Sequence, residues 1–272
     1  MQSSGDIYLC QVSGTVSCGA CCGLYNVSDP CRDRILSMLE RRSFDFAGVV
    51  RETDAIVDFG RKEYEKVSAE GRPMPEFHHC PYLGLIGTDR SRVGCLLHPM
   101  GVGNKGVDFR GLSYYGSMTC RVYFCPTHSR ISGNFKNIIR SVIDDWYLFG
   151  LIIQETSLLE AFHDEIALRC GQDFADLPYA LGAEAGRLWS RLFELKVSWP
   201  FSAAELPLAN YFFNDDLYSR QQVDYSPTGR TGSAYDAIFR ELGSVFESET
   251  QLVQAEQILD EIFDNLCAAL QP

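Results

Sequence analysis

The chain has 272 residues, 46% of them hydrophobic and 12% aromatic, and its formal net charge is −12. This composition is typical of a globular protein and excludes general disorder. No stretch is apolar enough to predict a membrane span, and the N-terminus lacks the basic flank and apolar run of a signal peptide. We therefore expect a cytoplasmic protein without a membrane partner, in which thiols stay reduced.

The charge is unevenly divided along the chain. Residues 1–131 carry 15 basic and 14 acidic side chains, whereas residues 132–272 carry 9 and 22. The acidic second part would repel a phosphate backbone, so we expect no nucleic-acid partner. The break coincides with the end of the cysteine-rich sequence. We predict two regions, a cysteine-rich metal-binding region over 1–131 and an acidic helical region over 132–272.

Two helices are predicted in the first region. Ser28-Asp29-Pro30 is a typical helix start, because a capping side chain precedes a proline in the first turn. The apolar residues after it, from Ile35 to Leu39, recur at roughly helical spacing. A second helix is predicted from about Phe46 to Ser68, and Gly71-Arg72-Pro73 ends it.

The second region has mostly helical periodicity. Asn134 can cap a helix that carries Phe135 to Trp146. Further helices are predicted over Leu148–Cys170, Leu181–Val197, Ala234–Phe246 and Thr250–Leu270, with a partly irregular connection over 198–232. The expected fold is mainly α, with an irregular α+β cysteine-rich metal-binding N-terminal part followed by a helical C-terminal part.

Nine of the eleven cysteines lie in the first 125 residues. Cys18 and Cys21 form a two-ligand loop, because two intervening residues let a tight turn direct both sulfurs at one ion. Cys22 points away from its neighbour, so it could ligate a second centre or remain a buried thiol. Cys80 and Cys95 each stand next to a proline or glycine in a predicted loop.

Eight of these cysteines are the candidate metal ligands. They are Cys10, Cys18, Cys21, Cys22, Cys80, Cys95, Cys120 and Cys125. A tetrahedral zinc site or a [4Fe–4S] cluster takes four protein ligands, so eight thiols could supply two centres, or one centre with spare thiols. We prefer zinc, which needs no assembly machinery and tolerates mixed Cys/His ligands, and keep the [4Fe–4S] cluster as the alternative.

Other interpretations of the cysteines and histidines stay open. A disulfide framework would need an oxidising compartment. Scattered buried thiols are the interpretation that we give to Cys170 and Cys267, each alone on a predicted helix. His79 abuts Cys80, and His128 follows Cys125 at ligand spacing, so each is a candidate ligand or a support for one.

The order of the cysteine motifs resembles a known family. Cys18-Gly-Ala-Cys21-Cys22, Cys80-Pro-Tyr-Leu, Gly94-Cys95-Leu-Leu and Cys120-Arg-Val-Tyr together resemble the YkgJ-type proteins, described as zinc- or iron-chelating domains. The resemblance covers about residues 8–128 and implies that the six cysteines of these motifs bind metal. Thr15 stands where the family usually has a further cysteine.

The resemblance also supplies an enzymatic alternative. Flagellin lysine-N-methylases look similar in their cysteine pattern, which implies an iron–sulfur redox protein or a cluster-dependent enzyme. Polar and aromatic side chains near the later cysteines could then line a pocket beside the cluster, or could simply pack there. These side chains are Arg110, Tyr114, Tyr115, Arg121 and Tyr123.

Overall fold

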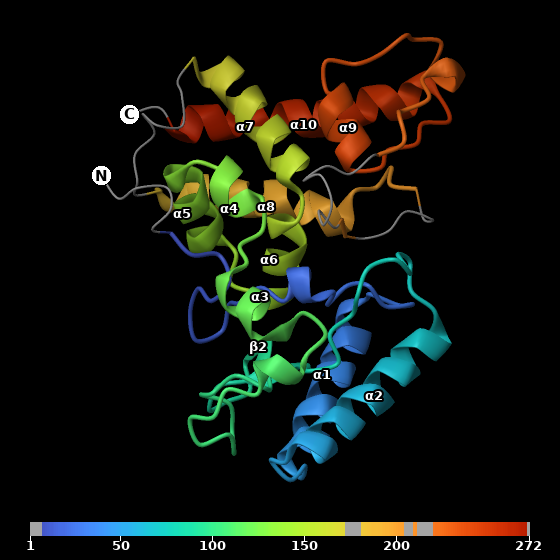
Figure 1. Ribbon diagram of the computed structural model, residues 1–272. Helices are drawn as coiled ribbons and strands as arrows, with labels where there is room; N and C mark the ends of the chain where they lie inside the picture. The colour runs from blue at the N-terminus through green and yellow to red at the C-terminus, as the bar shows by residue number, and fades with distance from the viewer. Residues whose placement is uncertain (1–6, 172–180, 204–208, 211–219, 271–272) are drawn as a thin grey trace. The chain divides into compact units, whose positions relative to one another are not determined.

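The computed structural model describes residues 7–171, 181–203, 209–210 and 220–270 (Figure 1). Helices dominate these residues, and their sheet is a single antiparallel pair of strands. The prediction of a mainly α fold is therefore confirmed. Within the same ranges, no helix combines the length and the apolar composition needed to cross a bilayer.

The described chain divides into two compact units. One consists of Leu9–Cys125 together with Asp145–Leu151, and we call it the cysteine unit. The other, the helical unit, consists of the described residues of Met1–Tyr8, Pro126–Asp144 and Ile152–Pro272. All eight candidate metal ligands belong to the cysteine unit.

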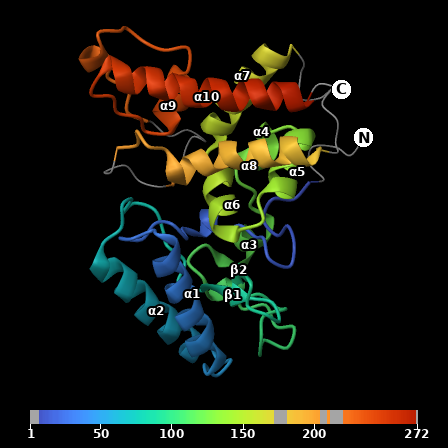
Figure 2. The same cartoon turned by 180° about the vertical axis from the view of Figure 1, so that it is seen from behind.

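The cysteine unit is built on two helices and a short hairpin. Helix α1 spans Arg32–Ala47, α2 spans Thr53–Glu70, and strands β1 (Leu83–Ile86) and β2 (Arg92–Cys95) pair antiparallel. In both views α1 lies between α2 and the strands (Figures 1 and 2). The 3₁₀ helices η2 (Ala20–Cys22) and η3 (Arg110–Leu112) and helix α3 (Gly116–Val122) complete it.

Helix α1 both begins and ends later than the sequence predicted: Cys31 is its N-cap, so Pro30 precedes the helix and does not lie in its first turn. Asp29 accepts a hydrogen bond from the backbone N–H of Cys31 at 3.0 Å, which fixes the turn before the helix. Phe46 lies in the last turn of α1, and Gly48 follows that turn. The prediction that a second helix starts at Phe46 was therefore wrong at this end. Arg51 explains the difference, because it donates to the Phe46 carbonyl at 2.9 Å and so caps the end of α1.

The helical unit contains most of the remaining helices. They are α4 (Thr127–Arg130), α5 (Gly133–Val142), α7 (Thr156–Cys170), α8 (Ala183–Ser198), η5 (Ser226–Thr228), α9 (Asp236–Glu241) and α10 (Glu249–Leu270). Helix α10 packs against α7 and α8 through a buried stripe that includes Leu259, Phe263 and Leu266. Helix α6 (Trp146–Ile153) runs from the cysteine unit into this one.

Two predictions about these helices need correction. The cap of α5 is Ser132, whose hydroxyl accepts from the Phe135 N–H at 3.2 Å, rather than Asn134. The helix predicted over 148–170 is two helices, since it breaks between Ile153 and Thr156. At the break Glu155 is fully buried and paired with Lys196 at 2.6 Å, a tertiary contact that helical periodicity does not reveal.

Helices α7 and α10 are joined by a disulfide between Cys170 and Cys267. We predicted both as isolated buried thiols, and that prediction was wrong. The partners are 97 residues apart in sequence, with Cα atoms 5.4 Å apart. No local spacing announces such a pair, because only the packing of α7 on α10 brings them together.

Candidate metal centre

The first cysteines lie on a turn closed by backbone hydrogen bonds. The Cys18 N–H donates to the Cys10 carbonyl at 2.9 Å, and Gln11 and Ser17 form an isolated antiparallel bridge. Cys21 and Cys22 follow at once in η2. Four of the eight cysteines are therefore fixed within thirteen residues, and the turn brings Cys10 beside Cys18, a contact that the sequence alone did not establish.

Two hydrogen bonds tie the loop of Cys22 to the loop of Cys80. The Cys80 N–H donates to the Cys22 carbonyl at 2.8 Å, and His79 Nδ1 lies 2.7 Å from the Gly23 carbonyl. A carbonyl can only accept, so Nδ1 carries the proton. Gly23 adopts φ +78°, and a Cβ there would lie 2.3 Å from the His78 carbonyl oxygen. This close approach requires glycine at position 23.

The hairpin places Cys95 near Cys80. Cys80 immediately precedes the hairpin, and its carbonyl accepts from the Leu83 N–H at 3.5 Å. Leu83 begins β1 and pairs with Cys95 at the end of β2. Residues fifteen positions apart are thus brought to one end of a two-stranded sheet. The other member of this neighbourhood is Cys120 on α3, whose sulfur lies 3.4 Å from the Ser113 hydroxyl.

Electrostatic interactions define a first set of four thiols, Cys10, Cys18, Cys21 and Cys125. Burial, together with the charges of Cys21 and Cys125, raises the pKa of Cys10 to about 12. Burial and the same two neighbours, with Cys10, hold the pKa of Cys18 well above its ordinary value. Charges interact this strongly only at short range, so these thiols share one region.

The second set of four consists of Cys22, Cys80, Cys95 and Cys120. Burial raises the pKa of Cys80 to about 12, with further contributions from the charges of Cys95 and Cys120. Burial likewise raises the pKa of Cys95 to about 11, with Cys120 adding to it. The charges of Cys80 and Cys95 also act on Cys22.

The two sets meet at the adjacent residues Cys21 and Cys22. The Cys22 thiol hydrogen-bonds to Cys21, which raises the pKa of Cys22 and lowers the pKa of Cys21. For Cys10, Cys18, Cys80 and Cys95, burial is the main influence, and the cysteines that act on each of them belong to its own set. Cys21 and Cys22 are therefore in contact, and the assignment of Cys22 to a second centre stays a prediction from the sequence.

The thiols are near one another but not at ligand distances. No group of three or more His, Cys, Asp or Glu side chains in the described part of the chain is placed so that it could hold a metal ion. Cys80 is buried, Cys120 is exposed and the other six thiols are half-buried. The donor chemistry of each set fits a four-thiolate zinc or iron–sulfur site, provided that the side chains converge by rotation.

The candidate histidines have different surroundings. His79 is fully buried, and its Nε2 has no hydrogen-bond partner among the described residues. Burial, the Arg42 charge and nearby cations hold the pKa of His79 well below its ordinary value, so the ring is neutral. His128 belongs to the helical unit, where burial and the charge of Lys136 lower its pKa.

A buried ion pair beside Cys80 escaped sequence reasoning. Arg42 is fully buried on α1, and its Nε donates to Glu63 of α2 at 3.1 Å. Its Nη1 lies 3.4 Å from the Cys80 carbonyl. A signal was available, because Arg42 stands on the buried stripe of α1 between Leu39 and Phe46, where the helical period calls for an apolar residue.

Three of the residues proposed for an enzymatic pocket, Arg110, Tyr114 and Tyr115, are engaged with neighbouring side chains. Arg110 is held by Asp108 through hydrogen bonds of 2.7 and 2.8 Å. Tyr114 stacks on His78 with ring centroids 4.3 Å apart, and Tyr115 meets the same ring edge-on at 5.4 Å. These contacts match the packing interpretation that the sequence left open.

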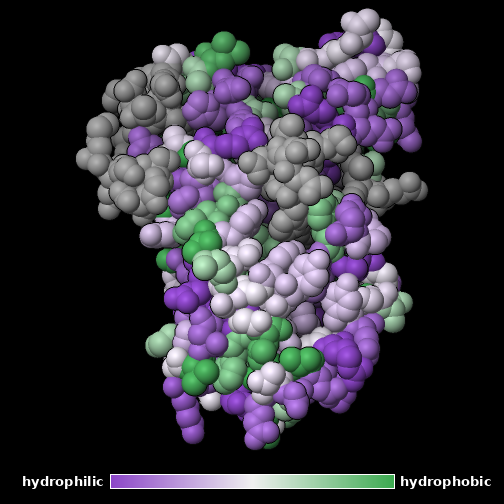
Figure 3. Space-filling view, in the orientation of Figure 1, coloured by the Kyte–Doolittle hydropathy of each residue, from purple (hydrophilic) through white to green (hydrophobic). Residues whose placement is uncertain are grey.

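The surface around α3 is partly apolar. Helix α3 has no buried residue, and Met118 and Val122 are exposed, as are Met100 and Val102 of the preceding loop. Figure 3 shows hydrophobic side chains on the surface at the level at which Figure 1 shows β2 and α3. Cys120 is therefore the solvent-facing member of its set.

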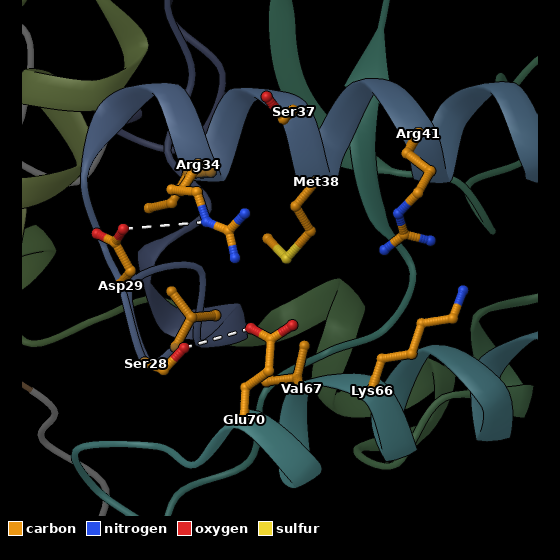
Figure 4. Close-up of a pocket in the computed structure, with 11 residues that line it drawn as sticks. Ser28, Asp29, Arg34, Ser37, Met38, Arg41, Lys66, Val67 and Glu70 are labelled. Atoms are coloured by element: carbon orange, nitrogen blue, oxygen red, sulfur yellow. Dashed lines mark hydrogen bonds and ion pairs between the residues drawn. The ribbon is translucent and has the colours of Figure 1, made fainter.

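A separate hollow of about 430 Å³ opens between α1 and α2 (Figure 4). Its floor includes Met38 and Val67, and charged side chains surround it. Those charges are mutually satisfied: Arg34 pairs with Asp29 at 3.9 Å, and Glu70 accepts from Ser28 at 3.3 Å. No cysteine lines this hollow, so it is distinct from the thiol sets.

Comparisons with family models, curated proteins and solved structures find no match to this chain. The resemblance to the YkgJ-type proteins therefore stays a prediction, carried by the cysteine motifs themselves.

Proposed function

We propose that this is a metal-binding protein whose cysteine unit holds two four-thiolate centres. One centre would use Cys10, Cys18, Cys21 and Cys125, and the other Cys22, Cys80, Cys95 and Cys120. The observation that carries the proposal is the gathering of eight cysteines in one compact unit, where backbone hydrogen bonds tie Cys18 to Cys10 and Cys80 to Cys22. Four is the ligand number that structural zinc and [4Fe–4S] clusters take.

Zinc is the metal we propose for both centres. Four thiolates complete the tetrahedral coordination of Zn²⁺ and leave no position open for a substrate, which favours a structural role. Such binding contributes ~10 kcal/mol or more to folding. That contribution suits a unit in which loops and short elements connect one hairpin to two helices.

A [4Fe–4S] cluster, in a redox protein or a cluster-dependent enzyme related to flagellin lysine-N-methylases, is the alternative proposal. Tyr115 favours it, because the charges of Cys22 and Cys80 act on its phenol, so an aromatic side chain lies beside the second set. Anaerobic purification followed by iron and sulfide analysis separates the two metals. Stoichiometric iron and sulfide with absorption near 400 nm would replace zinc, whereas a colourless zinc protein would exclude the cluster.

The proposed location is the reducing cytoplasm, in keeping with the free thiols at the eight candidate ligand positions. The Cys170–Cys267 bridge is the feature that argues for an oxidising environment. Counting thiols in protein purified under nitrogen, before any oxidation, decides whether the bridge exists in the cell.

Cobalt substitution tests the number of centres. Co²⁺ bound to thiolates absorbs strongly in the near ultraviolet, and titration of the metal-free chain is expected to saturate at two equivalents. Cys18→Ser and Cys95→Ser each remove a ligand from a different set, so each should saturate at one equivalent, and the double variant should retain none. Cys31→Ser is the matched control, because Cys31 is exposed and belongs to neither set. Saturation at one equivalent for the unsubstituted chain would contradict the two-centre arrangement.

A further inference from the structure

The side chain of Arg42, including its charged guanidinium group, is fully buried. Arginine is almost never fully buried unless its charge is paired. Its Nε donates to Glu63 at 3.1 Å and its Nη1 approaches the Cys80 carbonyl at 3.4 Å, while its Nη2 is buried without a hydrogen-bond partner in the described chain. A buried donor left without a partner costs about 1–3 kcal/mol, so its retention needs an explanation.

Glu63 does not neutralise this charge alone, because it serves three cations. It accepts from both terminal nitrogens of Arg41, at 2.6 and 2.8 Å, and from Lys66 at 2.7 Å, in addition to Arg42. Asp45 is a further partner of Arg41, at 3.6 Å. Arg41 and Lys66 are 40% and 54% exposed, so water screens them, whereas no water screens Arg42. The cluster of Arg41, Arg42, Lys66, Glu63 and Asp45 therefore carries one excess positive charge, and Arg42 is its buried cation.

One member of the second set, Cys80, lies beside Arg42. The guanidinium approaches the carbonyl of Cys80, and Cys80 itself is buried. Four thiolates around a divalent ion carry a net charge of −2. Burying such a charge is unfavourable unless a positive group stands close to it.

We infer that Arg42 supplies the positive charge that compensates the thiolates of Cys22, Cys80, Cys95 and Cys120, and that Glu63 holds the guanidinium in place for this role. The inference rests on the proposed function and assigns Arg42 as a positioning and charge-compensating residue, not as a ligand. It accounts for the retention of a buried guanidinium whose Nη2 has no hydrogen-bond partner in the described chain.

A purely structural tie between α1 and α2 explains these observations less well. Arg41 already makes that tie, with two short hydrogen bonds to Glu63. An apolar side chain at position 42 would continue the buried stripe of α1 without the cost of burying a charge. A buried arginine with an unpartnered donor is favoured only if another negative group shares its environment.

The test isolates the second centre in a Cys18→Ser background. Zinc affinity is measured by competition with a chromophoric chelator, and far-ultraviolet circular dichroism checks the fold of the metal-free chain. The double change Arg42→Met with Glu63→Gln removes both members of the pair, so neither charge is left buried alone. It is expected to weaken zinc binding by about 10–100-fold, as loss of a supporting residue around a metal site does. Arg41→Met, which removes a cation from the same carboxylate, should leave the affinity unchanged.

Arg42→Lys separates charge from shape. It keeps the positive charge without the guanidinium fork, and we expect zinc affinity within about threefold of the parent. A loss as large as that of the double variant would overturn charge as the cause. Unchanged affinity in the double variant, or an equal loss in Arg41→Met, would also overturn the inference while leaving the metal centres in place. A Cys18→Ser parent that binds no zinc would instead contradict the proposed function itself.

Discussion

Gly23→Ala tests whether the link between the Cys22 and Cys80 loops holds the candidate site together. Gly23 has φ +78°, and an added Cβ would lie 2.3 Å from the His78 carbonyl oxygen and 2.9 Å from the His79 Cα. Both contacts are with backbone, so no side-chain rotation relieves them. The two loops must separate for alanine to fit.

The expected cost has two parts. A left-handed conformation costs a residue with a side chain about 1–2 kcal/mol. Separation of the loops weakens the hydrogen bonds from Cys80 to Cys22 and from His79 to Gly23, each worth about 1 kcal/mol. We therefore expect Gly23→Ala to lower the free energy of unfolding of the metal-free chain by about 3–4 kcal/mol, and zinc affinity to fall with it.

Urea unfolding followed by circular dichroism measures the first effect, and chelator competition measures the second. Gly87→Ala is the matched control for the dihedral cost, because Gly87 has φ +88° with no atom within 4 Å of an added Cβ. It should lose only about 1–2 kcal/mol and keep its metal affinity. Equal losses in the two variants would show that loop contact contributes nothing, and the reasoning would be refuted.

Three further predictions concern pH, protons and the disulfide. Burial acts to raise the pKa of Glu63, but hydrogen bonds from Arg41 and Lys66 and the Arg42 charge outweigh it and lower the pKa to about 2. The folded state thus keeps Glu63 ionised below the pKa of about 4.3 that a glutamate has in the unfolded chain. Stability on the order of 2 kcal/mol should therefore be lost as pH falls from about 4.3 to 2. Glu63→Gln should abolish this part of the acid sensitivity, measured by urea titrations at each pH. Zinc loading at pH 7 should release about four protons per ion, because thiols must lose their protons to bind metal. Calorimetry in buffers of different ionisation enthalpy measures this number. Release of no protons would argue against thiolate ligation. Reducing the disulfide of the helical unit should lower the free energy of unfolding by about 2–4 kcal/mol, and a variant with alanine at both cysteines should show no response to reductant.

The fold class could be predicted because its signals are local. The buried positions of α10 recur at three- and four-residue steps, and the predicted range Thr250–Leu270 differs from the observed Glu249–Leu270 by one residue. Ends decided by distant side chains were missed. Arg51 caps α1, and the pairing of buried Glu155 with Lys196 accompanies the break before α7.

The candidate site, like the fold, could be predicted from the sequence only where the signal is local. Spacing alone predicted that Cys22 either ligates a second centre or remains a buried thiol. The turn that brings Cys10 beside Cys18 and the hairpin that brings Cys95 near Cys80 are tertiary contacts, and no sequence spacing encodes either of them.

The buried pair of Arg42 and Glu63 was missed because charged residues on helices are usually solvent-exposed. The hydrophobic period of α1 marks position 42 as interior, but it does not identify the partner 21 residues away on α2. Buried charges of this kind are found by asking which core positions of a helix hold the wrong residue type.

The most direct test of the two-centre account compares the alkylation of Cys120 and Cys31, residue by residue, by mass spectrometry. Both side chains are exposed, so they should react at similar rates with a chelator present. In the zinc-loaded chain the account predicts that Cys120 becomes protected together with the other seven candidate ligands, whereas Cys31 stays reactive. Equal labelling of the two residues with and without zinc would contradict it.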